Sequence, residues 1–294
     1  MIGVSPAYFF SLHGPGFGPH EITEDVPVLS SMGYEGFQAE IFDAGAGGGW
    51  TREAVRKLNG ASRSAGMQCT AFVAHFLGSS FASRASLKSF RVDATVQHAI
   101  DTAADIDGNG LFALPLPAFT ASGSESATAV EAASLFRVAL GSLALAVESA
   151  GMRLALELTR GNALGGSAAF LGLCREPGFG ELGLVFDTGH FWVMGETVGA
   201  LPELLGGRIV ATHLCDNDGL EKLSLCPGDG SVPFDRIIEG FASSGYYGSF
   251  DVEIVCPAGR VQAEYTKGFS AMQDIETRVK RASLTAAAHA RSTP

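Results

Sequence analysis

Basic residues are scarce in this chain: 20 Lys and Arg stand against 31 Asp and Glu, which gives a net charge of −11 over 294 residues. The basic residues are spread along the sequence, whereas a protein that holds a phosphate backbone needs a basic stripe. Cysteine is also sparse, and the five present are odd in number and form no Cys-x-x-Cys pair. This usage is typical of reduced thiols in a cytoplasmic protein. We therefore expect no nucleic-acid partner and a cytoplasmic location.

Targeting signals and long apolar runs are missing as well. The chain begins MIGVSPAYFF, with neither a basic leader nor a small-residue cleavage site, and no apolar run approaches the length of a membrane span. We expect these first residues to form a strand, and we expect no membrane partner. No Gly-x-Gly-x-x-Gly motif, which would indicate a dinucleotide site, follows the first predicted strand.

The chain is rich in residues that form cores and tight turns, because 46% of it is hydrophobic and 38 residues are glycine. Short apolar runs alternate with amphipathic stretches along its whole length. This alternation predicts strands over 2–10, 36–42, 67–75, 111–116, 152–158, 182–187, 208–214 and 249–255. It predicts helices over 22–32, 51–65, 85–105, 124–150, 167–174, 197–205, 234–244 and 262–290.

Eight strand–helix units predict an α/β protein, a single (β/α)8 TIM barrel domain over residues 1–294. An open doubly wound sheet is the competing architecture, and the missing glycine motif argues against it. The runs 45–49 and 120–128 are expected to be mobile loops on the face where barrel proteins bind ligands. We expect a C-terminal helix over about 260–290, with the last few residues (ARSTP) disordered.

Titratable residues stand at the carboxyl ends of the predicted strands, which converge on one mouth in a barrel. Asp187 ends a buried run and begins DTGH, where a glycine permits a sharp turn before His190. An alternative is that Asp187 only caps the next helix and His190 packs beneath it. The residues at the strand ends are Glu40, His75, Glu157, Asp187, His190, His213 and Glu253.

Strands five to eight each supply one residue to a set that we call the quartet: Glu157, Asp187, His213 and Glu253. Three carboxylates held together repel one another unless a cation compensates. Three oxygens and one nitrogen suit a divalent ion such as Mn²⁺, Mg²⁺ or Co²⁺ better than a thiolate-type zinc site. Taken singly, these residues also have structural interpretations. His213 could be a core histidine, Glu157 could pair with Arg153 or Arg160, and Glu253 could cap a helix. Four such residues at four consecutive strand ends favour the metal.

At this point the chain resembles the xylose isomerase-like TIM barrel proteins, which include ketose 3-epimerases, hydroxypyruvate isomerase, inosose dehydratase and apurinic endonucleases. The motifs that carry the resemblance are LALEL, FDTGH, ATHLCDND and PGDGSVPFDRIIEGFASSGYYGSFDVEI. The resemblance implies that the quartet binds one metal, with Mn²⁺ as the first choice, and that His190 and His75 line the substrate pocket.

Departures from the family pattern narrow the function. The segment 219–230 has no histidine, which leaves one metal and argues against the endonuclease members. The ketose 3-epimerases carry an Arg after the seventh-strand His, where this chain has Asp216, Asp218 and Lys222, and a second Glu after the fifth strand, where it has Arg160 and Asn162. The sugar contacts of those epimerases therefore do not transfer directly.

A single metal flanked by carboxylates suits proton abstraction beside a carbonyl, with a metal-stabilised enediolate. The resemblance implies that Glu157 and Glu253 take and return the proton in an isomerase or epimerase. The sequence has no dedicated phosphate cradle, so we expect a non-phosphorylated sugar, cyclitol or keto-acid as the substrate. A dehydratase of the inosose dehydratase type and a non-catalytic barrel subunit remain alternatives. A homodimer or homotetramer is expected from relatives. Further candidates for substrate contacts are Glu40, Trp192, Arg160 and Lys222, with Trp50 as a second possible aromatic wall.

Overall fold

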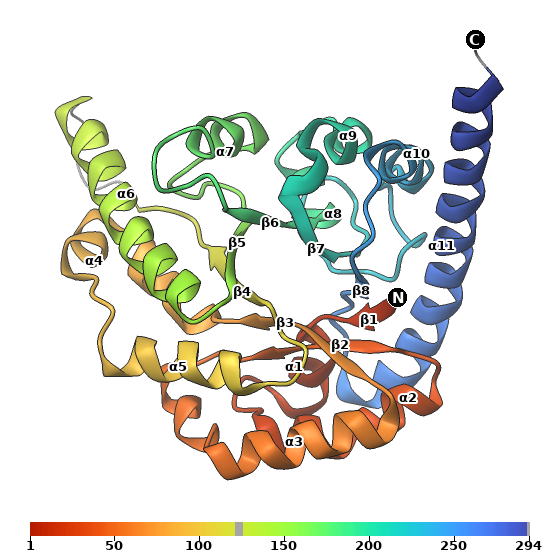
Figure 1. The fold of residues 1–294 in the computed structure, drawn as a ribbon, viewed down its shortest axis with the longest axis horizontal. Helices are drawn as coiled ribbons and strands as arrows, with labels where there is room; N and C mark the ends of the chain where they lie inside the picture. The colour runs from red at the N-terminus through yellow and green to blue at the C-terminus, as the bar shows by residue number, and fades with distance from the viewer. Residues whose placement is uncertain (121–125, 293–294) are drawn as a thin grey trace.

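A computed structural model describes residues 1–120 and 126–292, and it has a ring of parallel strands surrounded by helices (Figure 1). The strand order is β7-β6-β5-β4-β3-β2-β1-β8, and a parallel bridge between Leu214 and Val252 brings β7 and β8 together. The predicted TIM barrel is confirmed. The strands are β1 (Ile2–Val4), β2 (Gly36–Glu40), β3 (Gln68–Val73), β4 (Leu111–Leu116), β5 (Arg153–Leu158), β6 (Gly183–Asp187), β7 (Ile209–His213) and β8 (Phe250–Val252).

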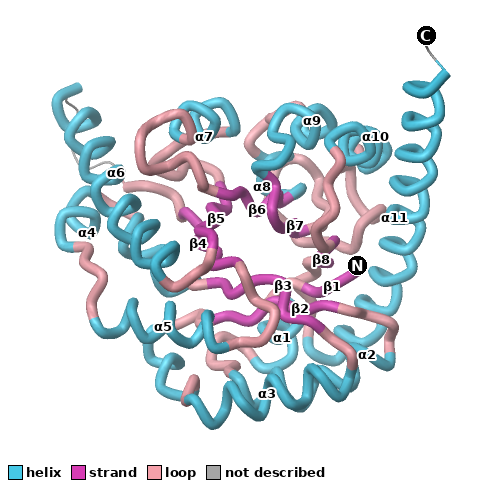
Figure 2. The backbone as a smooth tube through the Cα atoms, viewed as in Figure 1, coloured by secondary structure: helices cyan, strands magenta, loops and turns pink. Residues whose placement is uncertain are grey.

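The helices form the outer layer around these strands (Figure 2). The α-helices are α1 (Ala7–His13), α2 (Pro19–Ser31), α3 (Arg52–Ala65), α4 (Arg84–Ser89), α5 (Ala94–Asp105), α6 (Ser126–Ser149), α7 (Ser167–Leu173), α8 (Thr188–Val193), α9 (Leu201–Leu205), α10 (Phe234–Ser244) and α11 (Val261–Ser292). Short 3-10 helices are η1 (Ala44–Gly49), η2 (His75–Phe81), η3 (Val198–Ala200), η4 (Gly206–Arg208) and η5 (Ala258–Arg260).

Two predicted elements are wrong in detail. The strand expected over 2–10 ends at Val4, and α1 follows, because Pro6 adopts helical angles (φ −58°, ψ −18°) and starts the turn. The helix expected over 85–105 divides into α4 and α5. The division occurs where the Asp93 side chain accepts hydrogen bonds from the amides of Thr95 and Val96 and so begins α5.

The outcomes for the two expected loops and for the C-terminus depend in part on which residues the structure describes. The run 45–49 lies within the short helix η1. Of the segment 120–128, residues 126–128 begin α6, and 121–125 lie outside the described residues. The C-terminal helix α11 continues to Ser292, so residues 290–292 are helical, and Thr293 and Pro294 lie outside the described part. The single-domain assignment for 1–294 stays a proposal.

The inside of the barrel explains how the strand ends come together. Side chains of a strand alternate between its two faces, so residues two apart share a face. The strands β3 to β7 contribute small residues to one buried cluster: Val73, Ala113, Ala155, Val185 and Ala211. The residues Glu157, Asp187 and His213 each lie two positions beyond a member of that cluster. The same pleat that fills the barrel with small side chains therefore directs this part of the quartet into its mouth.

Helix α6 carries a 21-residue stretch, Ala129–Ser149, that is long and apolar enough to cross a membrane by length and composition alone. From the sequence we expect no apolar run of that length, and this stretch differs from that expectation. In the structure one face of α6 packs on the barrel through Phe136, Leu140, Leu143 and Val147, which are at most 2% exposed. An apolar outer helix of a barrel satisfies the same length and composition test, because its inner face is part of the core.

Phe241 on α10 joins the outer layer to the strands. Its ring lies 5.5 Å from that of Phe186 on β6, 5.4 Å from Phe250 on β8 and 5.1 Å from Tyr246. We expect Phe241→Ala to lower the free energy of unfolding by about 3–5 kcal/mol, because it removes a fully buried ring. Urea denaturation followed by fluorescence measures this. The control Val138→Ala, on the exposed face of α6, should change it by less than about 0.5 kcal/mol, and equal effects would contradict the assignment of the core.

Candidate active site at the carboxyl ends of the strands

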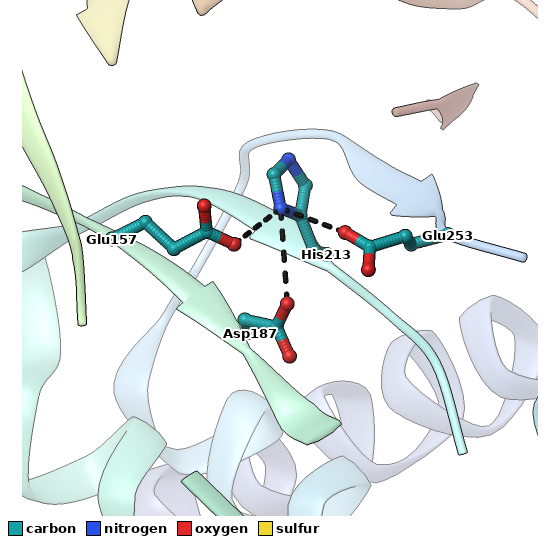
Figure 3. A group of neighbouring side chains, drawn as sticks. All are labelled: Glu157, Asp187, His213 and Glu253. Carbon is teal, nitrogen blue, oxygen red and sulfur yellow. Dashed lines mark hydrogen bonds and ion pairs between the residues drawn. The ribbon is translucent and has the colours of Figure 1, made fainter. Parts of the chain in front are cut away.

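The structure brings the four residues of the quartet together in a buried cluster. One potential ligand atom from each lies within 4.8 Å of all the others. His213 Nδ1 is 2.8 Å from Glu157 Oε1, 3.1 Å from Glu253 Oε2 and 3.9 Å from Asp187 Oδ2. Figure 3 shows the two glutamates on opposite sides of the imidazole, with the aspartate below it.

Asp187 has a separate task for each carboxylate oxygen. Oδ1 accepts a hydrogen bond of 2.7 Å from the backbone amide of His190 and so caps α8. Oδ2 is buried, accepts no hydrogen bond and faces the cluster. The helix-cap interpretation of Asp187 and the ligand interpretation are therefore compatible, because they use different oxygens.

The charges in the cluster shift one another's pKa values. Burial by itself lowers the pKa of the His213 ring, but the Glu157 and Glu253 carboxylates outweigh it and raise that pKa well above the ordinary value. Burial by itself raises the pKa of Glu157, but His213 lowers it to about 2. Burial acts on Glu253 in the same way, and Lys222 together with His213 lowers its pKa well below the usual range. The two glutamates are thus kept ionised by neighbouring cations.

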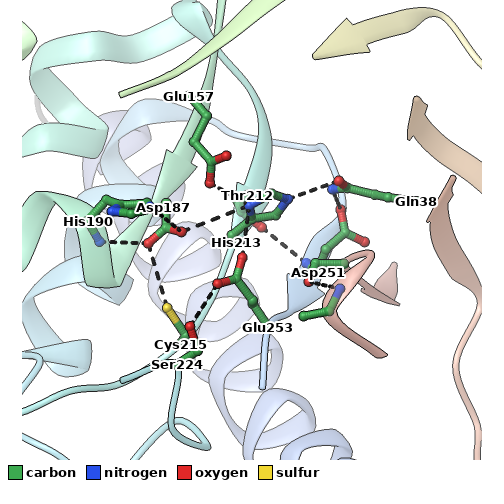
Figure 4. Close-up of polar contacts among 12 residues, drawn as sticks. Gln38, Glu157, Asp187, His190, Thr212, His213, Cys215, Ser224, Asp251 and Glu253 are labelled. Carbon is green, nitrogen blue, oxygen red and sulfur yellow. Dashed lines mark hydrogen bonds and ion pairs between the residues drawn. The ribbon is translucent and has the colours of Figure 1, made fainter. Parts of the chain in front are cut away.

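Gln38 on β2 orients the histidine, and the sequence did not predict this role. The Gln38 side-chain amide donates to Asp251 Oδ2 at 2.9 Å, so its carbonyl oxygen faces His213 Nε2, also at 2.9 Å (Figure 4). Asp251 Oδ2 accepts further hydrogen bonds from Ser249 and Thr70. The Nε2 atom of His213 therefore carries its proton, and Nδ1 faces the carboxylates.

Asp251 itself fits inside the barrel only because β1 has a glycine opposite it. A Cβ atom on Gly3 would lie 2.0 Å from Asp251 Oδ1. The signal available in the sequence is a polar residue two positions before two of the strand-end carboxylates, Gln38 before Glu40 and Asp251 before Glu253. Gln38 and Asp251 meet because β2 and β8 lie on either side of β1. No local sequence pattern shows that arrangement.

The loop after β7 places two more side chains against Glu253. Ser224 Oγ donates to Glu253 Oε1 at 3.0 Å, and Lys222 Nζ contacts the same oxygen. Lys222 Nζ also lies 2.8 Å from Asp187 Oδ2. Ser224 has φ 48°, the one positive value at a non-glycine position among the described residues, so this turn holds its hydroxyl at some backbone cost.

A cavity of about 250 Å³ lies above the cluster. One wall is aromatic: His75 stacks on Phe42 with ring centroids 4.2 Å apart, and Phe10 lies 5.1 Å from Phe42. The other wall is polar and includes His190 together with Glu157, His213 and Glu253 of the quartet. Phe10 and Phe42 were not singled out in the sequence, because a phenylalanine near a strand end is indistinguishable there from core packing.

The predicted substrate contacts divide into two groups. His75, His190 and Glu40 line the cavity, and burial, with the Glu157 charge adding to it, raises the pKa of Glu40 to about 8. Among the described residues, the cavity wall does not include the other three predicted contacts, Trp192, Arg160 and Lys222. Trp192 donates through Nε1 to Ser231, Arg160 donates to the carbonyl of Leu220, and Lys222 contacts Asp187 and Glu253. Trp50 is a core residue that packs edge-on against Phe72.

The donor set of the quartet fits a divalent cation. Three carboxylate oxygens and one imidazole nitrogen converge, and Asp187 Oδ2 is a buried acceptor without a hydrogen bond. Such an atom is costly unless a cation compensates it. The residues that could hold the ion are therefore those of the quartet, with Gln38 orienting its histidine.

A parallel eight-stranded barrel with a buried carboxylate–histidine cluster at its carboxyl mouth defines the class of this protein. Within that class the chain belongs to the xylose isomerase-like TIM barrel family, whose sequence profile matches residues 26–275. This confirms the resemblance seen in the sequence.

Three solved structures show how far the fold likeness extends. A D-tagatose 3-epimerase-like protein has a TM-score of 0.70 at 15% identity, over 95% of this chain and 98% of that one. IolI with a bound zinc atom has a TM-score of 0.67 at 14% identity, over 95% of this chain and 97% of that one. A xylose isomerase domain protein from Alicyclobacillus acidocaldarius subsp. acidocaldarius has a TM-score of 0.67 at 16% identity, over 95% of this chain and 99% of that one. Such identities show the fold alone.

One curated relative, the uncharacterized protein y4fM of Sinorhizobium fredii (strain NBRC 101917 / NGR234), is 32% identical over 65 residues. This match spans 22% of the present chain and 21% of y4fM.

Gln38→Leu tests the hydrogen-bond chain that orients His213. We expect it to lower the free energy of unfolding by about 1–3 kcal/mol, because it leaves the buried Nε2–H of His213 without a partner and removes one of the hydrogen bonds that Asp251 Oδ2 accepts. Urea denaturation measures the loss, and ¹H–¹⁵N spectra of the ring should show the Nε2 proton of the wild type. The control is Gln97→Leu, which removes an exposed hydrogen bond to Asp101 and should change stability by less than about 0.5 kcal/mol. Equal stability of Gln38→Leu and wild type would exclude this role.

Proposed function

We propose that this protein is a divalent-metal-dependent isomerase or epimerase acting on a small carbohydrate or a related carbonyl compound. The observation that carries the proposal is the position of Glu157 and Glu253, two ionised, buried glutamates on opposite sides of a single potential cation site at the floor of a small cavity. A substrate bound there is exposed to a base on each side. Relatives with printed names that concern sugars, such as the D-tagatose 3-epimerase-like protein, support the substrate class.

The quartet would hold the ion, and Mn²⁺ is the first choice, with Mg²⁺ or Co²⁺ as alternatives. Such an ion supplies Lewis-acid polarisation of a substrate carbonyl when bound. One glutamate takes the proton from the carbon next to that carbonyl, and the other, after it has taken a proton from water, delivers that proton to the substrate. Delivery to the opposite face of the same carbon inverts it, and delivery to the adjacent carbon exchanges aldose and ketose.

The walls of the cavity support a neutral substrate. Its volume of about 250 Å³ is just below the ~300 Å³ of the smallest drug-sized ligand pockets, which suits a single small molecule. The described lining contains neither Arg nor Lys, the side chains that most often hold a phosphate group in proteins. Phe10, Phe42 and His75 offer a surface for the C–H face of a sugar, and protonated Glu40 can donate a hydrogen bond to a substrate oxygen.

A dehydratase is the second candidate, and the observation in its favour is His190. Its ring lines the cavity, with Nε2 4.0 Å from Asp187 Oδ2. In this second candidate function the imidazole is the group that faces the departing hydroxyl. The first proton abstraction is shared with the isomerase, and only the fate of the hydroxyl differs. Cytoplasmic location and a homo-oligomeric state are further parts of this proposal.

Solvent exchange tests the role of the glutamates. In D₂O the Mn²⁺-loaded protein should introduce deuterium into ketoses, inososes or keto-acids at the carbon next to the carbonyl, measured by NMR and mass spectrometry. Glu157→Gln and Glu253→Gln should each reduce the exchange about 10²–10⁴-fold, the usual range for loss of a general acid–base group. Loss of water in addition to exchange would identify the dehydratase.

Glu239→Gln, an exposed glutamate on α10, serves as the matched control and should retain full exchange. Metal content is measured on every variant, so that loss of a proton-transfer group is distinguished from loss of the ion. Full exchange in both active-site variants would contradict the two-glutamate mechanism.

Elemental analysis after dialysis against Mn²⁺ tests the metal site itself. We expect about one ion per chain in the wild type and a greatly weakened site in the Glu157→Gln/Glu253→Gln double variant, because two of the three carboxylates of the quartet lose their charge. A wild type without bound metal would exclude the proposed chemistry and favour a barrel retained for binding.

A further inference from the structure

Lys222 reaches the quartet from outside the substrate cavity. Its Nζ atom lies 2.8 Å from Asp187 Oδ2 and contacts Glu253 Oε1, and its side chain is 18% exposed. It belongs to the loop between β7 and α10, and it is absent from the described cavity lining. The ammonium therefore contacts the carboxylates without lining the cavity.

The loop that carries Lys222 is held in place by backbone hydrogen bonds. Asp216 and Leu225 pair their backbones in both directions, at 2.9 and 2.8 Å. At the tip, Asp218 Oδ1 accepts from the amides of Leu220 and Glu221. The PGDG turn closes over the base of the loop, where Gly228 donates to the Asp216 carboxylate. The position of Lys222 thus follows from a structured hairpin.

The glycine of DTGH makes room for the Lys222 side chain. A Cβ atom on Gly189 would lie 2.8 Å from both Cδ and Cε of Lys222, and 2.7 Å from Cys215 Sγ. The aliphatic part of Lys222 therefore lies directly on the Gly189 backbone, in a space that any other residue would fill. This contact is independent of the ion pairs.

The two oxygens that Lys222 contacts belong to residues that the metal needs. Asp187 Oδ2 accepts no hydrogen bond although the ammonium is 2.8 Å away, so the contact is an ion pair without hydrogen-bond geometry. A carboxylate pair buried this deeply is costly unless a positive charge faces it. The ammonium supplies one positive charge at the place where a divalent ion would supply two.

We propose that Lys222 is an internal counter-cation of the metal site: it occupies the side of the site formed by Asp187 and Glu253 when no metal is bound, and it leaves that position when a divalent cation binds. Lys222 therefore competes with the metal and lowers its affinity. This inference rests on the proposed metal site and adds a means by which loading of that site is controlled by the loop after β7.

Metal affinity is the first test. Chelator-treated wild type, Lys222→Met and the exposed control Lys57→Met are titrated with Mn²⁺ by calorimetry. Methionine keeps the apolar stem on Gly189 and removes the charge. We expect Lys222→Met to bind Mn²⁺ at least about tenfold more tightly than wild type and Lys57→Met to match wild type. Equal or weaker binding by Lys222→Met would overturn the inference and leave the metal site intact. Absence of binding in all three proteins would remove the metal site, and the inference with it.

Chemical labelling of the wild-type protein is the second test and needs no Lys222 variant to fold. Acetic anhydride is applied with and without saturating Mn²⁺, and acetylation of each lysine is measured by mass spectrometry. Lys222 should be labelled several-fold faster when Mn²⁺ is bound, because its ammonium is released from the carboxylates. Lys57, whose side chain is 70% exposed, should be labelled equally in both states. Unchanged protection of Lys222 in metal-saturated protein would overturn the proposal.

Discussion

The constraint on which the rest of the site depends is the compensation of three buried carboxylates in one place. Glu157, Asp187 and Glu253 lie around His213 at the carboxyl ends of β5 to β8, and all three are buried. Such a group is stable only if positive charge faces it. In the structure the imidazole of His213 and the ammonium of Lys222 supply that charge, so the surrounding residues can be understood by how they place these two groups.

The barrel places the two cations by different means. His213 is positioned through the pleat of β7 and oriented by the hydrogen bonds from Gln38 to Asp251, which require the glycine on β1. Lys222 is positioned by a hairpin loop and by the glycine at the start of α8. One cation is therefore fixed by the strands of the barrel, and the other is carried by a surface loop, which costs less to rearrange than a strand.

The sequence was sufficient to predict the barrel and the quartet, since both depend on short-range regularities: alternating apolar runs, and a polar residue at the end of each run. It was insufficient for Gln38 and Asp251, because their pairing depends on β8 and β2 both lying beside β1, a relation between residues 213 positions apart. The sequence predicted Lys222 only as a substrate contact. Nothing in the local sequence shows that its loop folds back over Gly189. The end of the first strand at Val4 was missed because Tyr8 and Phe9 have the apolar character of a strand, whereas in α1 they are core residues.

Charge compensation also bears on how the protein folds without its ion. An imidazolium and an ammonium together carry the same charge as one divalent cation, so the carboxylates are compensated equally before and after an exchange of one for the other. The barrel can therefore complete its core with the site closed by its own side chains. On loading, the proton of His213 Nδ1 and the ammonium are the groups that must give way, while the apolar interior of the barrel and the aromatic wall of the cavity have no reason to move. The chemistry of the site would then be switched by a local exchange of cations, with the fold unchanged around it.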